Sequence, residues 1–331
     1  DANENVAVDA PGLFTPSSVS FWAANGAADG GSIVAGGANS QLPSASSRNL
    51  YTYTGNYTAD GVPESPANPR LSHPSNGLTD TNSSLTPAML GLTDANVADT
   101  VINTARASTL ADPLHSRPAL VTYGGTESNP DVTLFVATNG GFLHAIDAST
   151  NGEATAGEEQ FAFIPQELLT NLTALADNTG AHPYGLDGDV TAWVKESDDA
   201  DHTIEPSDND HVYVYVGMRR GGSNYYALDV TNRDVPRLKW VIKGGAGGTI
   251  GFSELGQSWS RPEVTTIKSG SSTRTVLIFG GGYDTEGIGD SFWDIIRQTL
   301  ESPHPNGLVR LEKPIPPYRL RKNPRKEFQD P

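Results

Sequence analysis

The residues of this chain that could perform chemistry are seven histidines and 39 acidic residues, and there is no cysteine. Without cysteine the chain has no thiolate nucleophile, no disulfide framework and no Cys-ligated zinc. The histidines never fall at metal-ligand spacing, and the nucleophile-elbow, dinucleotide-binding, Walker and zinc-protease motifs are all missing. The sequence therefore predicts no catalytic residue, no cofactor-binding residue and no metal ligand.

The densest group of carboxylates lies in residues 196–210, a segment that contains no Lys or Arg. A calcium loop needs oxygen ligands at alternating positions, a turn glycine and a closing bidentate glutamate, and this segment has no glycine. The carboxylates of Asp187 to Asp189 and of Asp284 to Asp290 also lack the required spacing. We interpret residues 196–210 as a solvated loop, and weak calcium binding there stays open.

Two aspartates close a repeated hairpin. In each copy an apolar strand, a pair of glycines and a returning strand precede the aspartate: Leu134 to Asp147 with Gly140 and Gly141, and Val214 to Asp229 with Gly221 and Gly222. Paired glycines supply the positive φ angles of a tight turn, and a carboxylate at a strand end accepts N–H groups of the following turn. We interpret both aspartates as turn caps, and the repeat as a repeated supersecondary unit.

A second repeated phrase marks where each unit opens. His115-Ser-Arg117-Pro118 returns as Trp259-Ser-Arg261-Pro262, and a more divergent opening lies at residues 185–194. Three units are therefore expected to begin near residues 115, 185 and 259. Two histidines stand in these repeats, and the other copy replaces His115 by Trp259 and His144 by Tyr226. We interpret both histidines as filling volume at contacts between units.

The composition of the 331 residues favours short strands joined by many turns, because it includes 35 glycines and 23 prolines. A net charge of −17 argues against nucleic acid or an anionic membrane face as the main partner. No apolar run approaches the length of a signal peptide or a membrane span, which indicates a processed chain or a fragment.

The chain divides into three parts by composition and pattern. Residues 1–110 form a Gly/Ser/Asn-rich lead-in with irregular, β-rich structure, residues 111–291 carry the repeats, and residues 292–331 form a basic, Pro-rich tail. Helical spacing occurs twice. One helix follows Asp94, with an apolar side made of Val97, Val101, Ile102 and Ala105, and one runs from about residue 165 to Gly180.

The third unit begins with an apolar strand at residues 276–280, but no returning phrase like the earlier ones follows Phe292. We therefore expect an exposed sheet edge near residues 276–283. Residues 293–331 hold eight Lys or Arg against five Asp or Glu, whereas residues 1–292 hold 14 against 34. The tail is interpreted as foreign to the repeat: a disordered tail, an interaction arm, or residues from a shifted reading frame.

Taken together, the phrases resemble the C-terminal β-propeller region of the PilY family of type IV pilus tip-adhesin and biogenesis proteins. The matching phrases are Ser47–Tyr53, Asp112–Pro118, Phe135–Asp147, Ala162–Leu168, His182–Gly188, Tyr225–Val230 and Leu255–Pro262. The resemblance implies a mainly β chain with an incomplete propeller of two full blades and the start of a third.

The same resemblance implies a non-enzymatic role in type IV pilus assembly and attachment. Implied partners are minor pilins or pilus tip proteins and a surface ligand of unknown kind, and the implied location is the outer cell surface or pilus tip of a bacterium. Members of the family carry a calcium loop, but its Asp-x-Asp/Asn-x-Asp-Gly pattern is missing from this sequence. No residue here therefore inherits the calcium site.

Two alternative functions stay open on the sequence. A quinone-dependent propeller dehydrogenase has blades with an Ala-x-Asp-x-x-Thr-Gly phrase, which residues 145–150 approach. Such phrases dock one blade on the next, so they do not by themselves indicate catalysis. The other alternative is a lectin-like extracellular propeller that binds glycans.

Overall fold

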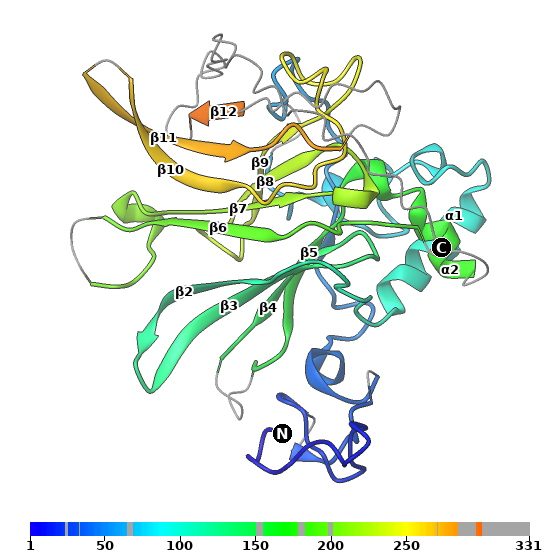
Figure 1. The fold of residues 1–331 in the computed structure, drawn as a ribbon. Coiled ribbons are helices and arrows are strands. Elements are labelled where there is room, and N and C mark those ends of the chain that lie inside the picture. Colours follow the sequence, from blue (N-terminus) through cyan, green and yellow to red (C-terminus); the bar gives the residue numbers. More distant parts are fainter. Residues whose placement is uncertain are drawn as a thin grey trace, which may run out of the picture.

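The computed structural model describes residues 1–23, 26–32, 34–64, 69–149, 155–177, 183–197, 201–269, 271–283 and 296–299. Within these residues the strands form three sheets that fan out beside one another, with the N-terminal segment below the first sheet (Figure 1). Neighbouring strands within the repeats are antiparallel and follow one another in sequence. Each repeat unit is therefore one meandering sheet.

The first sheet contains β2 (Ala119–Thr126), β3 (Asn129–Ala137), β4 (Leu143–Asp147) and β5 (Glu159–Phe163). A fifth strand, β1 (Leu50–Tyr51), pairs in parallel with β5 at the outer edge. All five residues of β4 are buried because this strand lies in the middle of the sheet and is covered on both faces. The lead-in thus contributes a strand to the first repeat unit.

The second sheet contains β6 (Val190–Lys195), β7 (His211–Gly217), β8 (Tyr225–Asp229) and β9 (Arg237–Ile242). Every residue of β7 after His211 is buried, as expected for a central strand of a sheet that lies between two others. One apolar cluster joins the lead-in, the first sheet and the second sheet. A separate aromatic-rich cluster joins the second and third sheets: Tyr213, Tyr215, Tyr225, Ala227, Trp240, Ile242, Phe252, Leu255, Leu277 and Phe279.

The third sheet contains β10 (Glu263–Ser269), β11 (Ser272–Phe279) and β12 (Ile296–Thr299). Residues Val276–Phe279 pair with β12, so the predicted exposed edge at residues 276–283 is wrong over this stretch. Strand β12 returns beside β11 after Phe292, although its sequence, Ile-Arg-Gln-Thr, lacks the phrase that ends β4 and β8. Strand pairing satisfies backbone groups whatever the side chains are, and so a strand can form without the repeat phrase.

These three sheets confirm the predicted fold class. The chain is mainly β: two units of four strands each, the first extended by β1, and a third unit of three strands, and across the described residues these sheets do not close into a ring. The predicted unit openings near residues 115, 185 and 259 come just before the first strands of the sheets, β2, β6 and β10. The structure is an incomplete β-propeller whose blades are the three sheets.

The predicted helix after Asp94 is present as α1 (Ala95–Ala107), and the Asp94 carboxylate accepts the backbone N–H groups of Asn96 and Val97. Val101 and Ile102 are buried on the predicted apolar side together with Ala98, but Val97 is 45% exposed, so its assignment to that side is wrong. The short 3-10 helices are η2 (Gly37–Gln41), η3 (Pro74–Asn76), η4 (Pro87–Leu90), η5 (Gln166–Leu168), η6 (Pro206–Asp208) and η7 (Arg219–Gly221).

The second predicted helix, from residue 165 to Gly180, forms in two pieces. η5 is followed by α2 (Asn171–Asp177), which lies against α1 (Figure 1). Leu168 and Leu172 are buried as expected of an apolar stripe. Gly180, the predicted stop, lies outside the described residues. Of the helices in the described parts of the chain, none has both the length and the apolar character needed to cross a bilayer.

The paired glycines of the hairpin turns have two different roles. Only the second glycine of each pair has a positive φ, +89° at Gly141 and +158° at Gly222, so the expectation that both glycines supply positive φ is wrong. The first glycine of the second pair allows close backbone approach, because a Cβ on Gly221 would lie 1.9 Å from the carbonyl oxygen of Gly185. Gly185 itself lies between the two turns, and its Cβ would be 2.4 Å from the Gly141 nitrogen.

The Gly221→Ala substitution is expected to lower the free energy of unfolding by about 2 kcal/mol or more, because the methyl group must displace the backbone of the segment that precedes β6. The matched control is Gly77→Ala, since Gly77 has negative φ and its nearest neighbour to a new Cβ is 3.7 Å away. The control should change the free energy by less than about 0.5 kcal/mol. Urea denaturation followed by circular dichroism measures both, and equal stabilities of the two variants would contradict this packing argument.

Candidate functional site

The Ser-Arg-Pro phrases contact β6 from both of its neighbours. The carbonyl oxygen of Arg117 accepts the Val190 N–H at 3.0 Å, and the Pro262 carbonyl accepts the Thr191 hydroxyl at 2.9 Å. Arg261 Nε also donates to the Thr191 hydroxyl at 3.3 Å. Pro118 immediately precedes β2, as Pro262 immediately precedes β10. The phrases thus connect the first strands of successive blades.

The aspartates that end the hairpins make the hydrogen bonds of turn caps. Asp147 accepts the Ser149 N–H at 2.9 Å and the Thr155 hydroxyl at 2.5 Å. Asp229 accepts the Thr231 N–H at 3.1 Å. Because each carboxylate is held by its own turn, the pair does not converge on a shared reaction centre.

The two repeat histidines form polar contacts that a purely volume-filling role would not require. His144 is buried, and its Nδ1 lies 2.7 Å from a Glu159 oxygen. Tyr226, at the equivalent strand position, donates its hydroxyl to Glu167 at 2.9 Å. His115 Nδ1 lies 2.8 Å from Asp187. His144 and its counterpart Tyr226 both reach a carboxylate, whereas Trp259, the counterpart of His115, donates from Nε1 to the amide oxygen of Gln257 at 3.1 Å.

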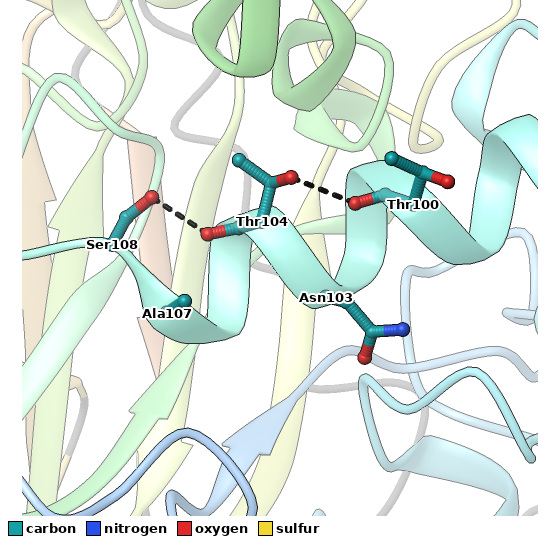
Figure 2. A pocket seen from close by; sticks show the side chains of 5 residues that line it. All are labelled: Thr100, Asn103, Thr104, Ala107 and Ser108. Carbon is teal, nitrogen blue, oxygen red and sulfur yellow. Dashed lines mark hydrogen bonds between the residues drawn. The ribbon is translucent and has the colours of Figure 1, made fainter.

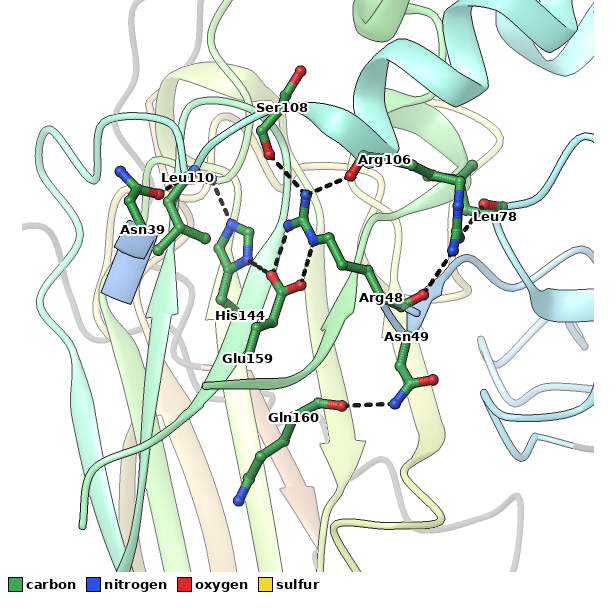
Figure 3. A network of polar contacts seen from close by, with 11 residues as sticks. Asn39, Arg48, Asn49, Leu78, Arg106, Ser108, Leu110, His144, Glu159 and Gln160 are labelled. Carbon is green, nitrogen blue, oxygen red and sulfur yellow. Dashed lines mark hydrogen bonds and ion pairs between the residues drawn. The ribbon is translucent and has the colours of Figure 1, made fainter. Parts of the chain in front are cut away.

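Glu159 stands at the centre of a buried network that joins the lead-in to the first blade (Figure 3). Arg48 donates two hydrogen bonds to its carboxylate, from Nε at 2.7 Å and from Nη2 at 2.9 Å, and also donates to the carbonyl of Ser108 at 2.8 Å. Arg106 donates to the Arg48 carbonyl at 2.9 Å. Residues from the lead-in, α1, β4 and β5 are thereby joined at one carboxylate.

Burial on its own raises the pKa of the Glu159 carboxyl, but hydrogen bonds and charge from His144 and Arg48 outweigh it and lower the pKa to about 2. The side chain is fully inaccessible to solvent, and that of Arg48 is 4% exposed. Arg48 and Glu159 therefore form a buried ion pair, in which each charge offsets the cost of removing the other from water. Its position inside the core indicates a structural role.

A hollow on the outside of α1 is the second place where side chains gather (Figure 2). Its lining consists of Thr100, Asn103, Thr104, Ala107 and Ser108, all of them exposed. Thr104 and Ser108 donate their hydroxyls to backbone carbonyls of the same helix at 2.8 and 2.7 Å. The hydroxyls are thus used within the helix, and no charged group points into the hollow.

The carboxylates that lack calcium-loop spacing have internal partners. Asp210 is buried and accepts the N–H groups of Ser197 and Glu205 at 2.6 and 2.8 Å, so the prediction that residues 196–210 are wholly solvated is wrong at this position. Residues 198–200 and 284–290 lie outside the described residues. Within the described ranges, no group of three or more His, Asp or Glu side chains is placed to hold a metal ion.

One exposed group of charged and aromatic residues was not found from the sequence. It consists of Tyr184, Arg219, Arg220, Trp259 and Tyr283, and is called the arginine–aromatic cluster below. Arg219 and Arg220 lie in the β7–β8 turn, between the segments that open the second and third units. The sequence did carry one sign of this cluster, which is the length of the second hairpin turn. Five residues lie between the paired strand residues Ala137 and Leu143 of the first hairpin, whereas seven lie between Gly217 and Tyr225 of the second.

The Glu159→Gln substitution is expected to lower the free energy of unfolding at neutral pH by about 3 kcal/mol or more, because it leaves the Arg48 guanidinium buried without its counter-charge. Since the folded pKa of Glu159 is below that of the unfolded chain, this contribution is present above about pH 4.5 and is lost as pH falls towards about 2. Urea denaturation at several pH values tests both statements. Glu158→Gln is the control, and equal stability of the two variants at neutral pH would refute the assignment.

Comparison with known proteins places the chain in a family. The sequence model described as the PilY1 beta-propeller domain matches residues 94–294. A protein of Pseudomonas aeruginosa strain UCBPP-PA14 named type IV pilus biogenesis factor PilY1 is 29% identical over 205 residues, which cover 55% of this chain and 16% of that protein. A Xylella fastidiosa homolog of PilY1 is 32% identical over 169 residues, 50% of this chain and 12% of that protein.

The crystal structure of the Pseudomonas aeruginosa PilY1 C-terminal domain is 25% identical to this chain, with a TM-score of 0.32, over 52% of this chain and 28% of that one. The chain thus spans less than a third of the length of each of these relatives. The family match covers strands β2 to β11, including β6 with its contacts to both neighbours, and ends just before β12. This chain belongs to the PilY1 beta-propeller family.

Proposed function

We propose that this chain is the propeller part of a type IV pilus biogenesis factor that acts by binding, as a tip adhesin and assembly component, and catalyses no reaction. The observation that carries the proposal is the family match across residues 94–294 together with relatives named type IV pilus biogenesis factor PilY1. None of these relatives is named as an enzyme.

The structure supports a binding role in two ways. The ionisable side chains of the repeats, such as Asp147 and His144, hold turns and blades together. The arginine–aromatic cluster, in contrast, is exposed at the ends of the second and third blades, with Tyr184 and Trp259 each 39% exposed and Tyr283 61% exposed. Exposed aromatic and arginine side chains are enriched at protein interfaces.

The proposed partners are minor pilins or other pilus tip proteins, and the proposed location is the bacterial surface at the pilus tip. The repeat residues are proposed to be structural: Gly140, Gly141, His144, Asp147, Gly221, Gly222, Asp229, Arg117, Pro118, Arg261 and Pro262. The lead-in, residues 1–110, is proposed to be the segment that positions the first blade, through β1 and Arg48.

The proposed pilus role is tested by deleting the codons for residues 94–294 from the chromosomal gene and restoring them on a plasmid. Surface pili counted by electron microscopy and twitching motility are expected to fall strongly in the deletion strain and to recover on complementation. Attachment of strains that retain pili measures the adhesin part separately. Normal pilus number and motility in the deletion strain would refute the assembly role.

We further propose that this chain binds no calcium with micromolar affinity, because its carboxylates lack the loop spacing and several already accept internal N–H groups. Isothermal titration of calcium into the chain, freed of divalent ions beforehand, is expected to give only the heat of dilution. Saturable binding with near-stoichiometric uptake would contradict this, and the Asp201→Asn variant would then test the segment at residues 196–210.

A further inference from the structure

The arginine–aromatic cluster has an arrangement that leaves hydrogen-bond donors facing solvent. The Arg219 guanidinium carbon lies 4.5 Å from the centre of the Trp259 ring. Arg220 lies 5.2 Å from the Tyr184 ring and 5.6 Å from the Trp259 ring, and donates from Nη1 to the Tyr184 hydroxyl at 2.7 Å. Stacking on aromatic rings fixes a guanidinium while its in-plane N–H groups stay available.

The charges of the Arg219 and Arg220 guanidiniums are only weakly neutralised by carboxylates of the described residues. Arg219 approaches Asp187 at 3.7 Å, which is outside hydrogen-bond distance, and none of the ion pairs among the described residues includes Arg220. Asp187 is buried, and its oxygen on this side has no hydrogen-bond partner in the described residues. Arg219 is thus only loosely paired and Arg220 has no ion-pair partner among the described residues, so the cluster has a local positive charge in a chain of net charge −17.

The backbone at the cluster is held in a conformation that disfavours arginine. Arg219 has a φ of +50°, the left-handed region, which costs a non-glycine residue about 1 kcal/mol or more. In the first hairpin the turn is shorter by two residues and has no arginine. A glycine at position 219 would adopt this φ without strain, so the cost of holding Arg219 there favours a use for its side chain.

The donor geometry selects the ligand class. A guanidinium presents parallel N–H groups that match the two oxygens of a carboxylate, in hydrogen bonds strengthened by charge. Sugar recognition relies on open aromatic faces, but guanidiniums already lie over the Trp259 ring and beside the Tyr184 ring. These observations favour carboxylate groups over an uncharged saccharide as the ligand.

We propose that the arginine–aromatic cluster binds an acidic peptide segment of a partner protein, with Arg219 and Arg220 each contacting a carboxylate of Asp or Glu. Trp259 and Tyr184 act as positioning residues that hold the guanidiniums. This inference names a ligand class for the binding role proposed above, but its test uses the chain and peptides alone. A failure here leaves the pilus phenotype of the deletion strain unaffected, so the two proposals can fail separately.

The probe is a short fluorescein-labelled peptide of alternating Asp and Glu, compared with the same peptide carrying Asn and Gln. Fluorescence anisotropy with the whole chain is expected to show saturable binding of the acidic peptide only, weakened by salt. Arg220→Gln and Arg219→Gly should each weaken binding about tenfold or more, equal to about 1.4 kcal/mol. Arg219→Gly also relieves the backbone strain, and circular dichroism establishes that each variant is folded before its binding is compared.

The matched control is Lys268→Gln, which removes one positive charge from the exposed part of β10 away from the cluster. Its affinity for the acidic peptide should equal that of the unmodified chain. The proposal is overturned by no binding of the acidic peptide, by equal binding of the neutral peptide, or by unchanged affinity in a folded Arg220→Gln variant. Displacement of the peptide by polygalacturonate at lower concentration would also overturn it, in favour of an acidic glycan.

Discussion

The structure depends on one compensated charge inside the first blade. Removing the Glu159 carboxylate from water is unfavourable, and only the converging donors of Arg48 and His144 make it stable. Because Arg48 also binds the carbonyl groups at the end of α1, the lead-in helix has a fixed place against β5. The lead-in and the first blade therefore form one structural unit, although their sequences differ in character.

A second constraint is the close approach of backbone between blades. Gly185 lies against the turns of both the first and the second hairpin, where even a methyl group has no room. The same arrangement recurs in the third blade, where a Cβ on Gly282 would lie 2.2 Å from the Gln257 carbonyl. Main-chain contact therefore fixes the turn of the second hairpin and Gly282 against the opening segments of their own units, and Gly185 also contacts the turn of the first blade.

Much of the fold was predictable because it repeats. Two copies of a hairpin ending in an aspartate predicted β3–β4 and β7–β8, and the Ser-Arg-Pro phrases predicted where β2 and β10 begin. Strand β12 was not predictable, because backbone pairing with β11 sets its position and its sequence does not resemble the other returning strands. The break between η5 and α2 was also missed, since a regular leucine spacing does not reveal a 3-10 turn.

The polar contacts of the side chains were predictable in part. The aspartate caps follow from local hydrogen bonding within a few residues, which a sequence displays directly. The Arg48–Glu159 pair and the arginine–aromatic cluster join residues far apart in the chain, 111 positions in the first case. Only the packing of one unit on another brings such groups together, and no local spacing indicates it.

The hydrogen bonds that join β6 to the blades on both sides limit which segments of such a gene can be inserted or deleted without loss of contacts. Thr191 bonds to the opening phrase of the third blade, and Val190 bonds to the opening phrase of the first. A recombination event that joined the gene at the boundary between two sheets would therefore remove hydrogen-bond partners from the blade that remains. The segment that can be duplicated or excised with these bonds intact does not coincide with a single sheet. It runs from one Ser-Arg-Pro phrase through the next.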